Sequence, residues 1–122
     1  MVSKNNRIFI VDDESDTCLA LEKILEENGF KVDKFTDPFL ALKNFKADFY
    51  GMLILDIKMP KMNGFELYLE IKKIISKVIK VMFLTDVSEY QQYDAFKKEV
   101  FPKLGERHFV SKPIENEGIV KE

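Results

Sequence analysis

The sequence predicts an α/β fold in which a parallel β-sheet lies between two layers of helices. Short apolar runs alternate with segments of helical periodicity from one end of the chain to the other, and such runs are typical of buried parallel strands. Right-handed crossovers between successive strands then favour a three-layer sandwich. The predicted strands cover residues 7–11, 30–35, 52–55, 81–84 and 108–110.

The first two predicted helices have clear boundary signals. The first begins near Ser15 and ends at Asn28-Gly29, because glycine after a polar residue is a common helix stop. The second opens at Asp37-Pro38, with aspartate as the cap and proline in the first turn. Its predicted buried side consists of Phe39, Leu42 and Phe45.

Two more helices are predicted in the second half of the chain. Apolar residues of period 3.6 indicate a third helix from about Gly64 to Val78. Ser88 and Gln91 form a capping-box signature for the fourth. The second strand, 30–35, alternates in polarity, which predicts a place nearer the edge of the sheet.

Composition limits the class of protein. The chain has 122 residues and a net charge of −2, which suits one domain spanning residues 1–122 and gives no electrostatic footprint for nucleic acid. No apolar stretch approaches the ~20 residues of a membrane span, and residues 1–6 lack a signal-peptide core. The one cysteine, Cys18, excludes an intramolecular disulfide and a cysteine metal cluster. These features predict a cytoplasmic protein that binds neither membrane nor nucleic acid.

Polar residues with related chemistry follow four of the predicted strands. Asp12 and Asp13 follow the first, Asp56 the third, Thr85 the fourth and Lys112 the fifth. The carboxyl ends of parallel strands gather at one edge of an open sheet, where ligands bind. Three carboxylates, a hydroxyl and an ammonium group at one point are suited to a hard cation and a phosphoryl group.

Each of these residues taken alone also has an ordinary structural interpretation. The Asp12-Asp13 pair can cap the first helix, Asp56 can end a turn, Thr85 can be a plain strand residue and Lys112 a loop lysine. The peptide between Lys112 and Pro113 can be cis at modest cost, which would direct the lysine inward. Any one of these residues could stand at a strand end by chance, but it is far less expected that all of them do so together.

At these residues the sequence resembles the receiver domain of two-component response regulators. The resemblance rests on Val11-Asp12-Asp13, on the stretch 56–60 (Asp-Ile-Lys-Met-Pro) with Gly64, on Thr85 and on Lys112-Pro113. It covers residues 7 to about 114. It implies a flavodoxin-like three-layer sandwich with a five-stranded parallel sheet, and a phosphoacceptor switch in a phosphorelay.

The resemblance also implies a role for each matching residue. Asp56 would receive a phosphoryl group from a sensor histidine kinase or a phosphotransfer protein. The implied ligands of Mg²⁺, or of Mn²⁺ as a substitute, are Asp12, Asp13, Asp56 and the backbone carbonyl of Lys58. Thr85 and Lys112 would contact the phosphoryl oxygens, and Thr85 with Phe109 would form the switch. The resemblance implies a regulatory domain and not an enzyme, although such a domain can slowly remove its own phosphoryl group.

The sequence departs from the family pattern in three places. Asp86 stands where a small residue usually follows the threonine, so it should repel a phosphoryl group unless it points away or meets Lys58. Asp86 and Lys58 are therefore expected to modulate the phosphorylated state. The loop around 101–105 is longer than common. Ten residues follow Lys112, and Gly118 interrupts them, which predicts a last helix that is short, missing or truncated.

A short last helix would leave apolar surface uncovered beside the first helix. We expect this surface either to mediate homodimer formation or to be covered by a native chain that continues beyond Glu122. In a third arrangement, the loop at 101–104 folds over the gap, and neither a dimer nor a longer chain is required to cover the apolar surface.

Other functions fit the sequence less well than the phosphoacceptor. A phosphorylation-independent, receiver-like interaction module is the alternative that Asp86 favours. A phosphohydrolase with Asp56 as covalent nucleophile would need a second aspartate two residues later, where Lys58 stands. A flavin-binding protein of this fold would need a phosphate-binding loop that the sequence lacks. No feature identifies the kinase, the signal or the downstream output.

Overall fold

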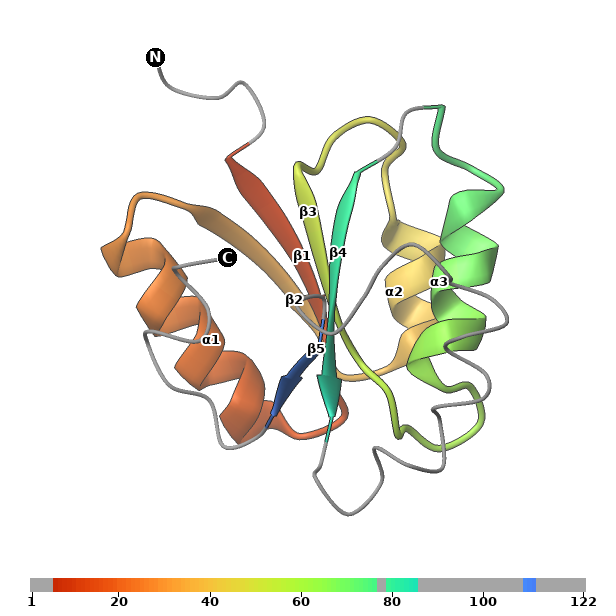
Figure 1. Ribbon diagram of the computed structural model, residues 1–122, viewed down its shortest axis with the longest axis horizontal. Coiled ribbons are helices and arrows are strands. Elements are labelled where there is room, and N and C mark those ends of the chain that lie inside the picture. The colour runs from red at the N-terminus through yellow and green to blue at the C-terminus, as the bar shows by residue number, and fades with distance from the viewer. Residues whose placement is uncertain (1–5, 77–78, 86–108, 112–122) are drawn as a thin grey trace.

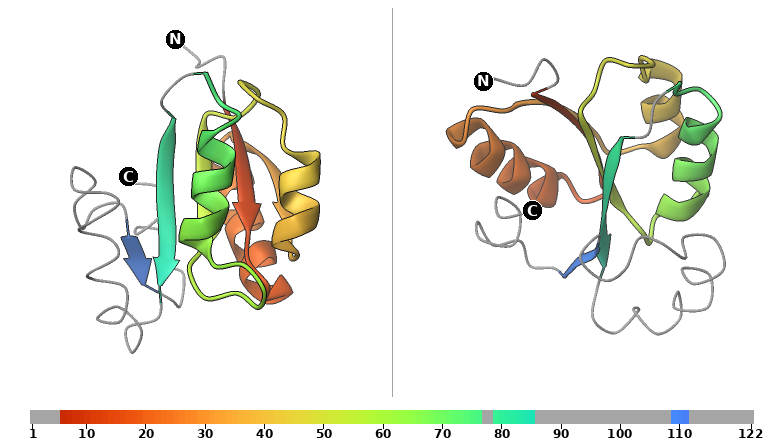
Figure 2. Two further views of the ribbon diagram at one scale, coloured as in Figure 1. Left: turned by 90° about the vertical axis from the view of Figure 1, so that its right-hand side faces the viewer. Right: turned by 45° about the horizontal axis from the view of Figure 1, so that its top comes forward.

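The computed structural model of the protein describes residues 6–76, 79–85 and 109–111. The described strands form a five-stranded sheet in the order β2-β1-β3-β4-β5, and every neighbouring pair is parallel. Figure 1 shows the sheet between the helices, and the left view of Figure 2 shows strand arrowheads pointing to one end. The strands are β1 (Arg7–Val11), β2 (Lys31–Phe35), β3 (Met52–Asp56), β4 (Lys80–Thr85) and β5 (Phe109–Ser111).

Three helices of the described residues cover the two faces of the sheet. They are α1 (Ser15–Glu27), α2 (Pro38–Asn44) and α3 (Gly64–Lys72). Helix α1 lies on one face, and α2 and α3 lie side by side on the other (Figures 1 and 2). The predicted α/β sandwich with a parallel sheet is therefore confirmed. The predicted fourth helix and the predicted short last helix lie outside the described residues.

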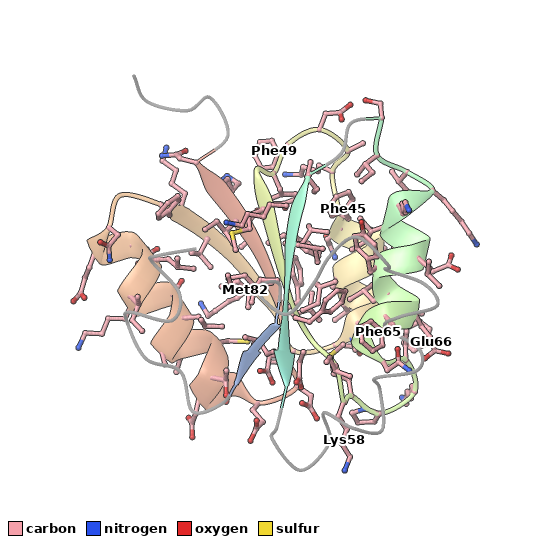
Figure 3. All side chains as sticks on the ribbon, in the orientation of Figure 1. Phe45, Phe49, Lys58, Phe65, Glu66 and Met82 are labelled. Atoms are coloured by element: carbon pink, nitrogen blue, oxygen red, sulfur yellow. The ribbon has the colours of Figure 1, made fainter. Side chains whose placement is uncertain are left out.

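The two faces of the sheet carry separate apolar cores. Ile8 and Ile10 of β1 face α1, whereas Phe9 and Val11 face α2 and α3, because side chains alternate along a strand. Figure 3 shows the same division across the molecule, with Met82 on the α1 side and Phe65 on the α3 side. Burial on both faces explains why these strands are continuous apolar runs in the sequence.

The boundaries of α1 follow the local sequence signals. Gly29 has a φ of 90°, the left-handed conformation that glycine adopts without steric cost. Its N–H donates to Glu26 O at 3.1 Å, and the N–H of Phe30 donates to Leu25 O at 3.0 Å. This pair of bonds is a Schellman motif, which satisfies carbonyls at the helix end. The predicted stop at Asn28-Gly29 is confirmed.

Helix α2 begins as predicted but buries different residues. Asp37 accepts hydrogen bonds from the N–H groups of Phe39 and Leu40, as a cap should. Pro38 and Ala41 are buried, while Phe39 is 48% exposed, so its predicted place on the buried side is wrong. The small residues Pro38 and Ala41 already occupy the positions that face the sheet, which turns Phe39 toward solvent.

Helix α3 is shorter than the apolar periodicity predicts. It ends at Lys72, with Lys73 as its cap, and Ile74 beyond it is 45% exposed. The predicted extension to Val78 is wrong for the described residues up to Ser76, and residues 77–78 are outside them. A nine-residue helix spans about 13 Å, close to the ~17 Å of a five-residue strand. The chain must turn there to reach the start of β4.

Candidate functional site

The candidate site lies where the chain reverses its winding around the sheet. β1 and β3 are neighbours, yet α1 follows β1 on one face and α3 follows β3 on the other. The loops after these strands separate at this point, and a crevice between them is where open α/β sheets bind ligands. Asp12 follows β1 directly, and Asp56 is the last residue of β3.

Three carboxylates meet at this edge of the sheet. One carboxylate oxygen from each of Asp12, Asp13 and Asp56 lies within 4.8 Å of the others. Asp12 is fully buried, Asp56 is 4% exposed and Asp13 is open to solvent. Like charges this close repel one another unless a cation lies between them. A set of hard oxygen donors with one open side suits Mg²⁺, which keeps part of its water shell.

The turn after β1 is fixed by hydrogen bonds to Asp12. Its backbone N–H donates to Phe35 O at 3.0 Å, which extends the pairing of β1 with β2. Its carboxylate Oδ1 accepts from the N–H of Glu14 at 2.9 Å. Its backbone carbonyl accepts from the thiol of Cys18 at 3.4 Å. The structural role as a helix-entry turn and the role in the acid cluster therefore coexist in the same residue.

The loop after β3 is held close to Asp56 by Gly64. The N–H of Ile57 donates to Leu84 O at 3.0 Å, and the N–H of Gly64 donates to Ile57 O at 2.8 Å, so the loop closes on itself. A Cβ atom at position 64 would overlap the backbone carbonyl oxygen of Asp56 and approach Ile57 Cα at 3.1 Å. Only glycine allows α3 to start this near the backbone of Asp56.

A capping box that the sequence analysis missed sets the start of α3. The side chain of Asn63 accepts from the N–H of Glu66, and the side chain of Glu66 accepts from the N–H of Asn63, both at 2.8 Å. The spacing of a cap residue and a glutamate three positions later was a readable signal. With Gly64, this box places the first turn of α3 beside the end of β3.

The remaining predicted site residues divide into three groups. Thr85 is the last residue of β4 and pairs in register with Ser111, while Phe109 begins β5 beside Phe83. Lys58 is exposed, and Figure 3 shows its side chain pointing away from the protein. Asp86 and the Lys112–Pro113 pair lie outside the described residues. The structure thus brings together the three aspartates and places the end of β4 at the same edge.

The comparison with known families decides the identity of the fold. The sequence matches the response regulator receiver domain family over residues 8–122. The chain belongs to this family. Within the described residues, no helix combines the length and the apolar character needed to cross a bilayer.

Individual relatives agree with this assignment. A response regulator receiver domain from Clostridium thermocellum has a TM-score of 0.76 and 27% identity, with 92% of this chain and 86% of that chain covered. The response regulator TrrA from Thermotoga maritima, in complex with Mg²⁺-BeF, has a TM-score of 0.71 and 30% identity, covering 94% and 93% of the two chains.

A curated relative shows how receiver sequences occur in longer proteins. The transcriptional regulatory protein PhoP of Bacillus subtilis, involved in alkaline phosphatase synthesis, is 28% identical over 110 residues, which cover 90% of this chain and 43% of that protein. The chain spans less than half of the length of the first curated relatives it matches.

Proposed function

We propose that this receiver domain is a phosphoacceptor switch in which Asp56 takes a phosphoryl group from a sensor histidine kinase or a phosphotransfer protein. The observation that carries the proposal is the convergence of Asp12, Asp13 and Asp56 within 4.8 Å at the switch point of the sheet. Membership of the receiver family supports the same role. We further propose that residues 1–122 form one receiver domain and act in the cytoplasm.

The proposed reaction is a displacement at phosphorus. A carboxylate oxygen of Asp56 attacks the phosphorus of a phosphohistidine, the P–N bond breaks, and an acyl phosphate forms on Asp56. The electron pair of the broken bond returns to the imidazole, which takes a proton from solvent. Asp56 is suited to this step because it ends β3, which pairs with β1 on one side and β4 on the other, so it stands at the carboxyl edge of the sheet.

Two negatively charged partners must approach each other for this reaction. Asp12, Asp13, Asp56 and the backbone carbonyl of Lys58 are the proposed ligands of Mg²⁺, with Mn²⁺ as a substitute. When held by these groups, the ion would supply positive charge that offsets the negative charge of the carboxylates and of an incoming phosphoryl group. The carboxylate cluster supports this proposal because oxygen donors are the ligands that Mg²⁺ prefers.

The other roles follow the family pattern and remain proposals. Thr85 and Lys112 contact the phosphoryl oxygens, and Phe109 moves with Thr85 when the charge at Asp56 changes. Asp86 and Lys58 modulate the lifetime of the acyl phosphate. The output is a further domain or a separate protein, since a curated relative such as PhoP is a longer transcriptional regulator.

Phosphorylation by a small acyl-phosphate donor tests the proposal directly. After incubation with acetyl phosphate and Mg²⁺, the intact mass should increase by one phosphoryl group. Asp56→Asn should abolish the increase, and a chelator should prevent it in the unmodified protein. Asp16→Asn is the matched control, because Asp16 is an exposed acid in the first turn of α1 and outside the cluster.

Three outcomes would contradict the proposal. Labelling of Asp56→Asn at the original level would place the phosphoryl group elsewhere. Labelling that ignores the chelator would remove the metal from the mechanism. Complete resistance to acetyl phosphate and to phosphotransfer proteins would favour a phosphorylation-independent interaction module.

A further inference from the structure

The chain's one thiol, that of Cys18, contacts the backbone of the acid cluster at Asp12. Cys18 is in the first turns of α1 and is 1% exposed. Its Sγ lies 3.4 Å from the backbone carbonyl oxygen of Asp12 and 3.8 Å from that of Phe35. The thiol therefore contacts the ends of both β1 and β2 at the point where the chain leaves β1 for the site. Its side chain belongs to the core that α1 forms with the sheet.

The carbonyl that Cys18 contacts belongs to the peptide between Asp12 and Asp13. The orientation of that peptide sets the direction in which the Asp13 side chain leaves the backbone. Asp12 and Asp56 are buried, whereas Asp13 is exposed and lies beyond the last residue of β1. Its carboxylate nevertheless lies within 4.8 Å of both of the others. The position of Asp13 therefore depends strongly on how the turn is anchored.

Described contacts fix this turn from two sides. The carboxylate of Asp12 holds the N–H of Glu14 on the far side of Asp13. The thiol of Cys18 holds the carbonyl on the near side. Outer contacts of this kind orient metal ligands without touching the metal, and their loss reduces metal affinity. A thiol is a weak donor with a long reach, which suits the 3.4 Å gap in an otherwise apolar core.

We propose that Cys18 is a positioning residue for the cation site: its thiol holds the Asp12–Asp13 peptide so that the Asp13 carboxylate faces Asp56. This inference rests on the proposed function, because it assumes that the three carboxylates bind Mg²⁺. The thiol itself neither binds the metal nor takes part in phosphoryl transfer.

Calorimetric titration of the full chain with MgCl₂ tests the inference. Cys18→Val keeps most of the side-chain volume and removes the donor, and Cys18→Ala removes both. Each should weaken Mg²⁺ binding by between about twofold and tenfold, the range expected for one hydrogen bond. Cys18→Ser restores a donor and should recover part of the affinity.

A control variant separates positioning from general destabilisation. Leu25→Val shortens another buried side chain on the same face of α1, about two turns from the site. Urea unfolding in the presence of a chelator gives the stability of each variant without metal. Leu25→Val should lose stability with no change in Mg²⁺ affinity, whereas Cys18→Val should lose affinity beyond what its stability predicts.

The outcomes distinguish this inference from the proposed function. If the unmodified protein binds no Mg²⁺, the proposed function fails and the inference fails with it. If the unmodified protein binds Mg²⁺ and the Cys18 variants that fold bind it equally well, only the inference is overturned. Equal losses of affinity in Cys18→Val and Leu25→Val would also overturn it, since the effect would then be general.

Discussion

The carboxylate that contacts the amino end of the sheet and those at its carboxyl end have opposite surroundings. Near the amino end, Arg7, the first residue of β1, donates to one oxygen of Asp33 in the middle of β2 at 2.7 Å, and the hydroxyl of Tyr50, just before β3, donates to the other at 2.7 Å. At the carboxyl end, three carboxylates converge within 4.8 Å. Figure 3 shows Phe49, whose ring lies 5.0 Å from the Arg7 guanidinium, at the opposite end from Lys58.

This difference separates stability from function. Asp33 gains a cation and a hydroxyl within the fold, so its charge is compensated when the chain folds. Crowded carboxylates instead raise the energy of the folded state until a cation arrives. A site that carries such repulsion responds strongly to a ligand, which a switch requires. Substitutions near the two ends should therefore differ in the size and the sign of their effects.

Of these substitutions, a methyl group at position 64 should cause the largest loss of stability. Gly64→Ala places a Cβ against the backbone of Asp56, which cannot yield as a flexible side chain would. We expect a loss of about 3 kcal/mol in the free energy of unfolding, together with loss of Mg²⁺ binding. Urea denaturation and calorimetric titration measure the two effects.

Gly29→Ala is the matched substitution at the amino end. A Cβ there meets nothing within 4 Å, but the φ of 90° disfavours any side chain. The cost should be about 1 kcal/mol, with Mg²⁺ binding unchanged. Equal costs at the two glycines would show that the close approach at Gly64 relaxes easily.

Removing the charge of Asp33 should destabilise the amino end. Asp33→Asn weakens the bonds to Arg7 and Tyr50, and the Arg7 and Asp33 side chains are only 29% and 28% exposed. A hydrogen-bonded charge in this setting contributes about 2 kcal/mol. Glu70→Gln, which breaks the exposed pair with Lys73, is the control and should cost less than about 0.5 kcal/mol. Similar losses in both variants would make the Asp33 network no better than a surface ion pair.

The same chemical change at Asp13 should have the opposite sign. Asp13→Asn relieves repulsion in the metal-free protein and should stabilise it by about 1 kcal/mol after screening. The unmodified protein should gain about 1.4 kcal/mol when Mg²⁺ is at ten times its Kd, and the variant should gain much less. Thermal melts with Mg²⁺ and with chelator give both quantities. A destabilised metal-free variant would mean that Asp13 acts mainly as a hydrogen-bond acceptor.

Alkaline pH should lower the free energy of unfolding because the phenol of Tyr50 loses its proton. Burial raises the pKa of Tyr50 well above its usual value, and the hydrogen bond to Asp33 raises it further. The folded protein therefore keeps the phenol proton at a pH where the unfolded chain loses it. The stabilisation is complete below the ordinary tyrosine pKa of about 10 and is lost as the pH rises toward the folded value.

Tyr50→Phe tests this dependence. The variant should lose less stability than the unmodified protein between neutral and strongly alkaline pH, measured by urea unfolding in a series of buffers. Burial also raises the pKa of Tyr68, so Tyr68→Phe is the control for a buried tyrosine without the Asp33 bond. Parallel pH profiles for the unmodified protein and Tyr50→Phe would contradict the prediction.

Local signals in the sequence were sufficient for most of the framework. The apolar runs located β1, β3 and β4 because burial on both faces leaves no polar alternation in these strands. Asn28-Gly29 and Asp37-Pro38 marked helix boundaries because caps act over a few residues. The convergence of Asp12, Asp13 and Asp56 followed from one rule, that parallel strands end at a common edge.

The two failures concern the buried face of α2 and the end of α3. Phe39 is as apolar as its neighbours, yet Pro38 and Ala41 fill the space beneath α2, and periodicity does not measure that space. The apolar period after α3 continued past Lys72, but the distance to the next strand ended the helix sooner. Both errors came from packing geometry, which depends on elements elsewhere in the chain.

The sequence by itself determined the α/β class, the strand positions and the acids at the strand ends, because each depends on periodicity or on residues adjacent in the chain. Only the tertiary structure decided which distant groups meet. Arg7 and Asp33 are 26 positions apart, and Tyr50 reaches Asp33 across 17. The thiol of Cys18 meets the carbonyl of Asp12 only because α1 docks on this face of the sheet. Such contacts depend on strand register and helix docking, and these are set by the packing of the whole core.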